Sequence, residues 1–237
     1  MQLMKKTGLA ESADRLLMAE KLDIDNAYML ELGCGTAFVT RKMAETYPGA
    51  KITAAEVDQI QHDKNLLIDD LPNVEFILAG MQEIPLPDNS VDLVVMLKSL
   101  HHVPIDLLST GFKEIHRVLK SGGKLYISEP VFDGAFNEIL RMFNNEEIVR
   151  QAAFDAIKQA VNSEKFDLQE EIHFLSRSEF DDFTAFENRI LNATHSEFNV
   201  SAELHAAIKD KFNQYPADES GIRVFLNPTR VDILIKC

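Results

Sequence analysis

The sequence predicts an α/β protein built on a doubly wound, mostly parallel sheet of seven strands. Three observations support this fold class: short apolar runs alternate with amphipathic segments, glycines follow several of the runs, and one run is almost wholly apolar. Strands that are separated by helices pair in parallel through right-handed crossovers, and the helices then cover both faces of the sheet. We interpret the chain, residues 1–237, as a single domain, because one core commonly reaches this length.

Five apolar runs predict the parallel strands, at residues 28–32, 51–57, 74–79, 91–97 and 124–128. The fourth run is apolar apart from Asp92, as is typical of a central parallel strand that is buried on both faces. Between the strands, apolar residues at three- and four-residue spacing predict helices over residues 40–47, 59–70 and 106–119. Residues 26–130 are therefore expected to form the core, preceded by an N-terminal helical segment over residues 1–25.

The pattern changes after residue 130. Residues 131–215 predict a helical lid, because residues 136–161 and 202–215 carry apolar side chains at helical spacing. Ser176 followed by Glu179 resembles a capping box and predicts the start of a further helix. No strand is expected in this segment.

The last segment, residues 216–237, returns to strand patterning. Residues 222–226 and 231–235 are rich in β-branched and apolar side chains, and Asn227-Pro228-Thr229-Arg230 separates them. This arrangement predicts an antiparallel hairpin at the edge of the sheet. The hairpin completes the seven strands.

Composition limits the partners and the compartment. The formal charge of −14, with no run of Lys or Arg, disfavours nucleic acid and anionic membranes as partners. No apolar stretch approaches the ~20 residues of a membrane-spanning helix. The two cysteines, Cys34 and Cys237, cannot build a disulfide framework, which fits a reducing compartment. We expect a cytoplasmic protein, whose oligomeric state the sequence leaves open.

A glycine-rich turn after the first strand is the main candidate for a ligand site. Gly33 and Gly35 lack a Cβ atom, so the turn can adopt positive φ angles and a ligand can approach its backbone. Glu31 precedes this turn at the carboxyl end of the strand, where ligands of such sheets bind. A carboxylate at this position favours a ligand with an ammonium or sulfonium group over a pyrophosphate.

A second acid, Glu56, follows at the end of the second predicted strand. This is the position from which a carboxylate accepts hydrogen bonds from the two hydroxyls of a ribose. Glu31 and Glu56 together predict a site for a ligand that joins a nucleoside to a charged group.

The sequence resembles the class I S-adenosylmethionine-dependent methyltransferases, in particular their small-molecule branch with its Rossmann-like sheet. Four segments carry the resemblance in order: Leu30 to Thr36, Glu56 with its strand, Gly80 to Val95, and Leu100 through Leu125. Within the last segment, Arg117-Val118-Leu119-Lys120 before Gly122-Gly123 is the distinctive run, whereas the glycine turn alone is weak evidence.

The resemblance implies S-adenosylmethionine as cofactor, with S-adenosylhomocysteine as its product. It implies contacts of the turn with the methionine end, of Glu56 with the ribose and of the Met81–Gln82 pair with the adenine. The cofactor-binding residues implied in this way are Glu31, Gly33, Cys34, Gly35, Glu56, Val57, Met81, Gln82, Leu97 and Lys98. Two positions depart from the family pattern, since Ala37 replaces the third glycine of the turn and Met81 replaces an acid that binds the adenine amino group.

His101 and His102 are the candidates for a general base, and a packing role is the alternative, because no orienting carboxylate is evident near them in the sequence. The other histidines lack the spacing of metal ligands; they are His62, His116, His173, His195 and His205. We therefore expect no metal site.

Three functions remain open at this point. The main hypothesis is a methyltransferase that acts on a small-molecule acceptor through oxygen, nitrogen, sulfur or carbon. The first alternative is a non-catalytic S-adenosylmethionine-binding scaffold or regulatory protein, since fold does not fix function. The second is an NAD-dependent oxidoreductase, which Glu31 and the missing third glycine disfavour.

Overall fold

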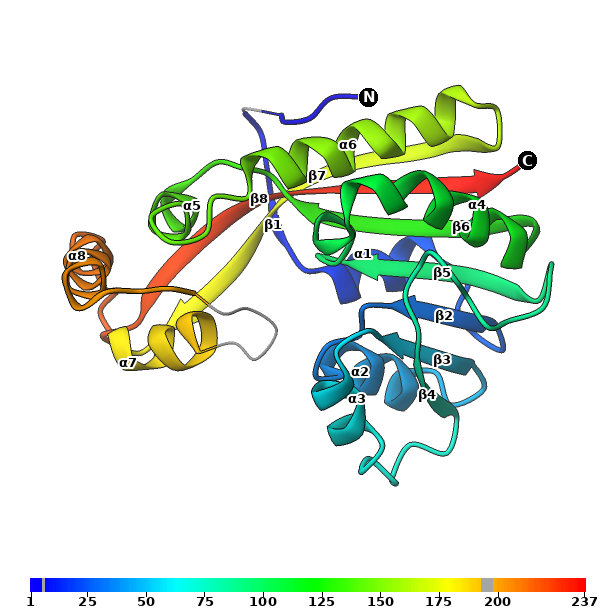
Figure 1. Ribbon diagram of the computed structural model, residues 1–237, viewed down its shortest axis with the longest axis horizontal. Coiled ribbons are helices and arrows are strands. Elements are labelled where there is room, and N and C mark those ends of the chain that lie inside the picture. Colours follow the sequence, from blue (N-terminus) through cyan, green and yellow to red (C-terminus); the bar gives the residue numbers. More distant parts are fainter. Residues whose placement is uncertain (6, 193–197) are drawn as a thin grey trace.

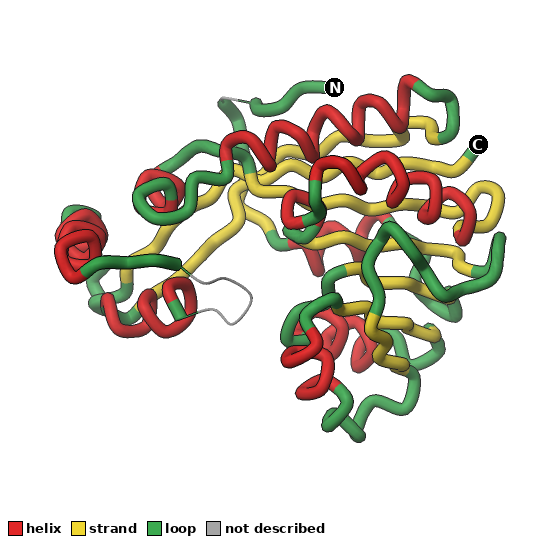
Figure 2. Tube along the Cα trace, viewed as in Figure 1, coloured by secondary structure: helices red, strands yellow, loops and turns green. Residues whose placement is uncertain are grey.

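The structure is a computed structural model that describes residues 1–5, 7–192 and 198–237, so that His195 lies outside the described residues. Within these residues the chain forms one eight-stranded sheet with helices on both faces (Figures 1 and 2). The strand order is β1-β7-β8-β6-β5-β2-β3-β4. The mostly parallel α/β sheet with antiparallel C-terminal strands confirms the predicted fold class, and one short strand, β1 (Glu11–Ser12), adds to the seven expected.

The parallel half of the sheet forms from the five apolar runs. Its strands are β2 (Tyr28–Leu32), β3 (Lys51–Glu56), β4 (Val74–Leu78), β5 (Val91–Leu97) and β6 (Leu119–Pro130). Strand β2 pairs with β3 on one side and with β5 on the other, so the strand order reverses beside β2. Ligands of open α/β sheets bind in the crevice at such a reversal, outside the carboxyl ends of the strands.

Helices cover both faces of this half. They are α1 (Asp14–Lys21), α2 (Phe38–Thr46), α3 (Gln59–Asn65) and α4 (Leu108–Val118), with short 3-10 turns at Leu100–His102 and Ile105–Leu107. Alternate side chains of the central strand β5 point to opposite faces of the sheet and belong to two hydrophobic cores. Leu93 and Val95 lie in the core under α1 and α2. Val94 and Met96 enter the core under α4.

The segment predicted as a helical lid contains a long strand, and that expectation was wrong. It forms α5 (Ala135–Leu140), α6 (Glu147–Asn162), β7 (Phe166–Phe180), α7 (Phe183–Phe186), a π-helical turn (Glu187–Leu191) and α8 (Ala202–Asn213). Ser176 and Glu179 lie within β7 and open no helix, and the helix predicted over residues 136–161 is divided at residues 141–146.

The C-terminal hairpin also differs from the prediction. Residues 222–226 and 231–235 belong to one continuous strand, β8 (Arg223–Lys236), which lies between β6 and β7 and pairs antiparallel with both. Strand β8 therefore pairs with β6 and β7 and not with a second arm of a hairpin. Residues 227–230, which were expected to form the turn of that hairpin, continue the strand. Pro228 lacks a backbone N–H group. It is tolerated there because the pairing of β8 with β6 begins only at the next residue, Thr229.

The outer ends of β7 and β8 run past the end of β6 and carry a third cluster of apolar residues. Figure 1 shows these two strands extending to α5, α7 and α8, away from the parallel half. The cluster contains Ile139, Phe180, Phe183, Phe186, Ile208, Phe212 and Phe225. We refer to this part, residues 135–143, 178–191 and 200–226, as the outer lobe. Among the described residues, no helix combines the length and the apolar character that crossing a membrane requires.

Candidate cofactor and acceptor sites

The glycine turn lies at the predicted edge of the sheet, between β2 and α2. The N–H groups of Gly33 and Cys34 donate to the Ala55 carbonyl of β3 (2.9 and 3.0 Å), which ties the turn to the neighbouring strand. Gly33 has φ +76°, and a Cβ atom there would lie 2.6 Å from the Ser99 Cβ. Gly35 has φ +52°, but a Cβ atom there would meet nothing within 4 Å. Gly33 is therefore required by packing, whereas Gly35 faces open space.

Glu56 reaches this turn from the end of β3. Its carboxylate accepts the N–H of Gly35 at 2.8 Å and the N–H groups of Val57 and Asp58 at 2.8 and 3.0 Å. The side chain is 7% exposed. The pairing of β2 with β3 thus brings the second predicted acid to the turn that follows the first.

Glu31 lies on the other side of the turn and is 3% exposed. The Thr40 hydroxyl of α2 donates to its carboxylate at 2.6 Å. Burial raises the pKa of Glu31 to about 7, against the opposing effect of the Thr40 hydrogen bond and with a further contribution from the charge of Glu56. A cationic ligand group beside Glu31 would relieve this cost and favour the ionised form.

Asn65 at the end of α3 also holds the turn, and the sequence analysis missed it. Its amide donates to the Gly35 carbonyl at 2.8 Å and to the Cys34 sulfur at 3.5 Å. Burial raises the pKa of the Cys34 thiol, so this cysteine packs and hydrogen-bonds but is no nucleophile. No sequence motif marks Asn65, since only the tertiary fold brings α3 to the turn.

The residues expected near the adenine divide into two groups. Val57 is 65% exposed and Gln82 is half-buried, so both side chains are open to a ligand. The Met81 side chain is 2% exposed and packs against Gly111 of α4 in the core. The contact with an adenine that was expected at this position is therefore left to Gln82 or to the backbone of Met81.

Arg117 gives the distinctive family run a structural role. From α4, its guanidinium donates to the carbonyls of Ile84 and Leu86 at 2.8 Å each and forms ion pairs with Glu114 and Asp88. These bonds fasten the loop that follows Met81 and Gln82 to the helix. Arg117 thereby supports the loop that follows the two residues expected to contact the adenine.

A pocket opens beside the end of β5. Leu97 is half-buried at the strand end, and Lys98 adopts φ +57°, a left-handed conformation that is unusual for a lysine. The Lys98 N–H donates to the Ser128 carbonyl at 2.7 Å, which holds this bend. The Lys98 side chain lines a pocket of about 270 Å³.

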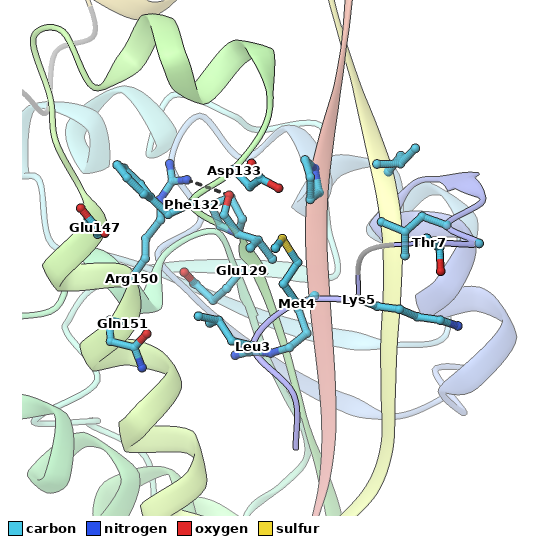
Figure 3. A pocket seen from close by; sticks show the side chains of 17 residues that line it. Leu3, Met4, Lys5, Thr7, Glu129, Phe132, Asp133, Glu147, Arg150 and Gln151 are labelled. Atoms are coloured by element: carbon cyan, nitrogen blue, oxygen red, sulfur yellow. Dashed lines mark hydrogen bonds between the residues drawn. The ribbon is translucent and has the colours of Figure 1, made fainter.

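This smaller pocket lies between the carboxyl ends of β5 and β6 and the outer lobe. Its polar wall includes Lys98, His101 and His102, and its apolar wall is formed by Phe136, Leu140, Phe143, Ile190 and Phe198. A larger pocket of about 810 Å³ adjoins it, sharing Asp133 and Arg150. Figure 3 shows this larger pocket, with Leu3, Met4 and Lys5 of the N-terminal segment on one side and Arg150 on the other.

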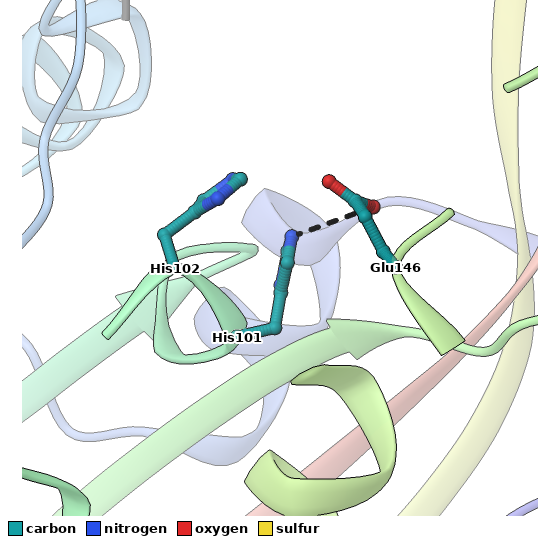
Figure 4. Close-up of side chains that lie close together, drawn as sticks. All are labelled: His101, His102 and Glu146. Carbon is teal, nitrogen blue, oxygen red and sulfur yellow. Dashed lines mark ion pairs between the residues drawn. The ribbon is translucent and has the colours of Figure 1, made fainter. Parts of the chain in front are cut away.

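His101 and His102 line the smaller pocket from the short turn after β5, and His101 is buried whereas His102 is exposed (Figure 4). Glu129 of β6 pairs with His101 Nδ1 at 2.5 Å and accepts the Leu100 N–H at 2.9 Å. Glu146 approaches His101 Nε2 to 3.9 Å from the start of α6. The structure thus supplies the orienting carboxylate that the sequence did not reveal, because Glu129 lies on a different strand.

The fold and this site together define a class of protein: a Rossmann-like α/β fold with two buried carboxylates beside a glycine turn at the switch point of its sheet. The fold is shared with the YcgJ protein from Bacillus subtilis, which is 14% identical, with a TM-score of 0.62 over 94% of this chain and 97% of that one. Residues 30–127 match the family described as "Methyltransferase domain". The matched segment, residues 30–127, thus has the sequence of a class I S-adenosylmethionine-dependent methyltransferase domain.

Curated relatives agree with this assignment. Methyltransferase GfsG from Streptomyces halstedii is 28% identical over 138 residues, which are 55% of this chain and 49% of the relative. The ubiquinone/menaquinone biosynthesis C-methyltransferase UbiE from Hahella chejuensis is 32% identical over 108 residues, 44% of this chain and 43% of the relative. The chain thus matches less than half the length of each of these relatives.

Proposed function

We propose that this protein transfers the methyl group of S-adenosylmethionine to a small-molecule acceptor bound in the smaller pocket. The observation that supports this most strongly is the meeting of two buried carboxylates, Glu31 and Glu56, at one glycine turn on the switch-point edge of the sheet. The alternative of an NAD-dependent oxidoreductase conflicts with the match of residues 30–127 to a methyltransferase domain, and we do not retain it.

The residues present fit the cofactor. Glu31 and the turn would hold the ammonium and sulfonium end, because a carboxylate stabilises positive charge and Gly35 leaves open space for a ligand. Glu56 would accept the ribose hydroxyls, and it already accepts three N–H groups there. Exposed Val57 would cover one face of the adenine. The remaining contacts proposed are from Gln82, the Met81 backbone, Leu97 and Lys98.

The acceptor side has a position that suits methyl transfer. Lys98 lies at the end of β5, where the proposed cofactor site and the smaller pocket meet. Phe136 and Phe143 offer apolar walls, so the pocket favours a partly apolar molecule with a few polar groups. The relatives include a C-methyltransferase of ubiquinone and menaquinone biosynthesis, which supports a small-molecule acceptor without fixing the acceptor atom.

When bound, S-adenosylmethionine supplies an activated methyl group. The protein then has to align the acceptor and exclude water, and alignment alone can lower the barrier by ~7–11 kcal/mol. Where the acceptor must lose a proton, His101 is the better placed of the two histidines, because Glu129 fixes its ring. His102 is more exposed and lies on the pocket rim.

The first test measures binding of the cofactor product. We expect S-adenosylhomocysteine, and not NAD, to raise the melting temperature in a dye-based thermal shift assay, because a ligand of the folded state stabilises it by mass action. Glu56→Ala should abolish the shift, whereas Glu45→Ala on the exposed face of α2 should keep it. A protein that ignores S-adenosylhomocysteine would contradict the proposal.

A second measurement separates the enzyme from the scaffold alternative. Conversion of S-adenosylmethionine to S-adenosylhomocysteine is followed with a panel of phenols, quinols, amines, thiols and carboxylic acids. Turnover with any acceptor supports the methyltransferase. Tight cofactor binding without turnover over the whole panel would favour the scaffold. The cytoplasmic location stays a prediction.

A further inference from the structure

Three potential metal ligands meet beside the smaller pocket. One ligand atom each from His101, His102 and Glu146 lies within 4.8 Å of the others, and the three side chains point toward one another in Figure 4. The histidines are adjacent in the turn after β5, and Glu146 immediately precedes α6. The sequence analysis expected no metal site, because Glu146 is remote from both histidines along the chain.

Neighbouring residues hold two of these ligands in place. Glu129 occupies Nδ1 of His101, which leaves Nε2 directed at Glu146, 3.9 Å away. A carboxylate on one ring nitrogen and a metal on the other is the common arrangement of metal-binding histidines. Glu146 is fixed in turn, since Asn144 donates to its Oε1 at 2.8 Å and Arg150 pairs with its Oε2.

The charges around the cluster also favour a cation. Glu129 and Glu146 carry two negative charges and Arg150 carries one positive charge, all at buried positions. The buried carboxylates therefore outnumber the buried guanidinium, and this excess of negative charge favours a cation beside His101 Nε2.

We propose that His101, His102 and Glu146 bind a divalent transition-metal ion, whose open coordination positions take an oxygen atom of the acceptor. Imidazole and carboxylate ligands suit ions such as Zn²⁺ and Co²⁺, and three protein ligands leave a position open, as in catalytic sites. The ion would lower the pKa of a bound hydroxyl or enol, whose proton passes to solvent. The class of acceptor is then an oxygen-bearing small molecule. This role rests on the proposed function, but the metal site itself does not.

The test is metal binding by untagged, chelator-treated protein. We expect one Co²⁺ per chain with visible absorption bands of a bound ion, displaced by Zn²⁺. His101→Ala and His102→Ala should each weaken Co²⁺ binding at least tenfold. Glu129→Gln should weaken it by about 10–100-fold through the orientation of His101.

Two controls exclude other sources of binding. His205 pairs with Glu187 at 2.6 Å on the outer lobe without belonging to the three-ligand group, so His205→Ala should bind Co²⁺ normally. Cys237 is an exposed thiol, and Cys237→Ser should likewise keep the bands.

Thermal shift with S-adenosylhomocysteine, measured on every variant, separates loss of the metal site from loss of the fold. Because His102 is exposed, His102→Ala should fold even if His101→Ala does not. Absence of saturable Co²⁺ bands in protein that binds S-adenosylhomocysteine, or bands that survive His102→Ala unchanged, would overturn the metal site. If the protein bound Co²⁺ but not S-adenosylhomocysteine, this result would contradict the proposed function and still support the metal site.

Discussion

The raised pKa of Glu31 makes cofactor binding dependent on pH. At about 7, it exceeds the ordinary value of 4.5, so the stability that the protonated group contributes is fully present below about 4.5 and is lost as pH rises through 7. A cationic ligand group beside Glu31 selects the ionised form, and binding then releases a proton. We expect affinity for S-adenosylhomocysteine to rise about tenfold from pH 6 to pH 8.

Isothermal titration calorimetry in buffers of different ionisation enthalpy measures both the affinity and the released proton. Glu31→Gln keeps the shape of the side chain and its contact with Thr40 but cannot ionise. This variant should bind more weakly and show little dependence on pH over the same range. A flat profile in the natural protein would show that Glu31 does not face the charged end of the ligand.

The two glycines of the turn should respond differently to alanine. Gly33→Ala places a Cβ atom 2.6 Å from that of Ser99 at a positive φ, so we expect a loss of several kcal/mol in the free energy of unfolding. Gly35→Ala meets no protein atom and should cost only about 1–2 kcal/mol for its left-handed backbone. Its main effect should be on the affinity for S-adenosylhomocysteine.

Urea unfolding and calorimetry on both variants separate the two effects. The decisive comparison is the ratio of affinity lost to stability lost, which should be larger for Gly35→Ala. An unchanged affinity in Gly35→Ala would mean that the ligand does not approach this side of the turn.

Ala37, which replaces the third glycine of the family turn, is a strained position. It precedes α2 with φ 59° and ψ 25°, a left-handed conformation that costs a residue with a Cβ atom roughly 1–2 kcal/mol. Glycine adopts it freely but loses more entropy on folding. We expect Ala37→Gly to leave the free energy of unfolding equal or raised by up to about 1 kcal/mol.

Ala44, inside α2 and also buried, is the matched control. Ala44→Gly should lower the free energy of unfolding by about 1 kcal/mol, because glycine disfavours a helix interior. Urea unfolding of both variants gives the comparison. Equal destabilisation by the two substitutions would contradict the strain at Ala37.

At the scale of elements, Arg117 links helix α4 to the loop that carries Gln82. Arg117→Ala removes two hydrogen bonds to loop carbonyls and two ion pairs, so we expect a loss of about 1–3 kcal/mol in stability, moderated by the partial exposure of the side chain. Affinity for S-adenosylhomocysteine should fall as well. Arg117→Lys keeps the charge but not the forked geometry, and should recover only part of both losses.

Thermal unfolding and calorimetry on the two variants give the result. Lys42, which pairs with Glu45 on the exposed surface of α2, supplies a control, since Lys42→Ala removes a cation without touching the loop. If Arg117→Ala lost stability but bound the cofactor normally, the loop would not contribute to the adenine side.

The elements that the sequence predicted correctly are those whose pattern is local. The apolar runs of β2, β3 and β5 are buried on both faces, so composition alone marks them. Strand β7 was missed because Phe166–Phe180 alternates apolar with charged side chains. Its charged positions resembled a helix surface and a capping box, and only pairing with β8 along its whole length makes it a strand.

The residues of the site show the same difference between local sequence patterns and tertiary contacts. Glu31 and Glu56 were predicted because the ends of neighbouring parallel strands meet at one edge of a sheet. Glu129 and Glu146 were not, because they reach His101 from a distant strand and a distant helix. The packing of the Met81 side chain against Gly111 was not predicted either, because it joins a loop to a helix that is distant in sequence.

At the scale of the whole molecule, two bodies of apolar packing meet at the smaller pocket. The two cores of the sheet contain the proposed cofactor site, and the separate cluster of the outer lobe stands on the projecting ends of β7 and β8. Phe143 and Ile190 line the pocket from the outer lobe, and Lys98 and His101 line it from the sheet. An acceptor in this pocket would therefore contact both bodies.

This arrangement predicts that cofactor and acceptor protect different parts of the chain from amide hydrogen exchange. S-adenosylhomocysteine at about 100 times its Kd stabilises the folded state by about 2.7 kcal/mol, so exchange should slow up to about 100-fold in residues 29–37 and 51–58. Residues 183–191 and 202–213 of the outer lobe should change less than about twofold, because their cluster can open without exposing the cofactor site.

An acceptor identified by turnover should then slow exchange in the outer lobe as well, since binding across the pocket couples the two bodies. Exchange measured by mass spectrometry on the free protein, on the S-adenosylhomocysteine complex and on the ternary complex follows both regions in one experiment. Equal slowing of the outer lobe by S-adenosylhomocysteine alone would show that the molecule opens as a single cooperative unit. The acceptor would then bind to a lobe that the cofactor has already ordered.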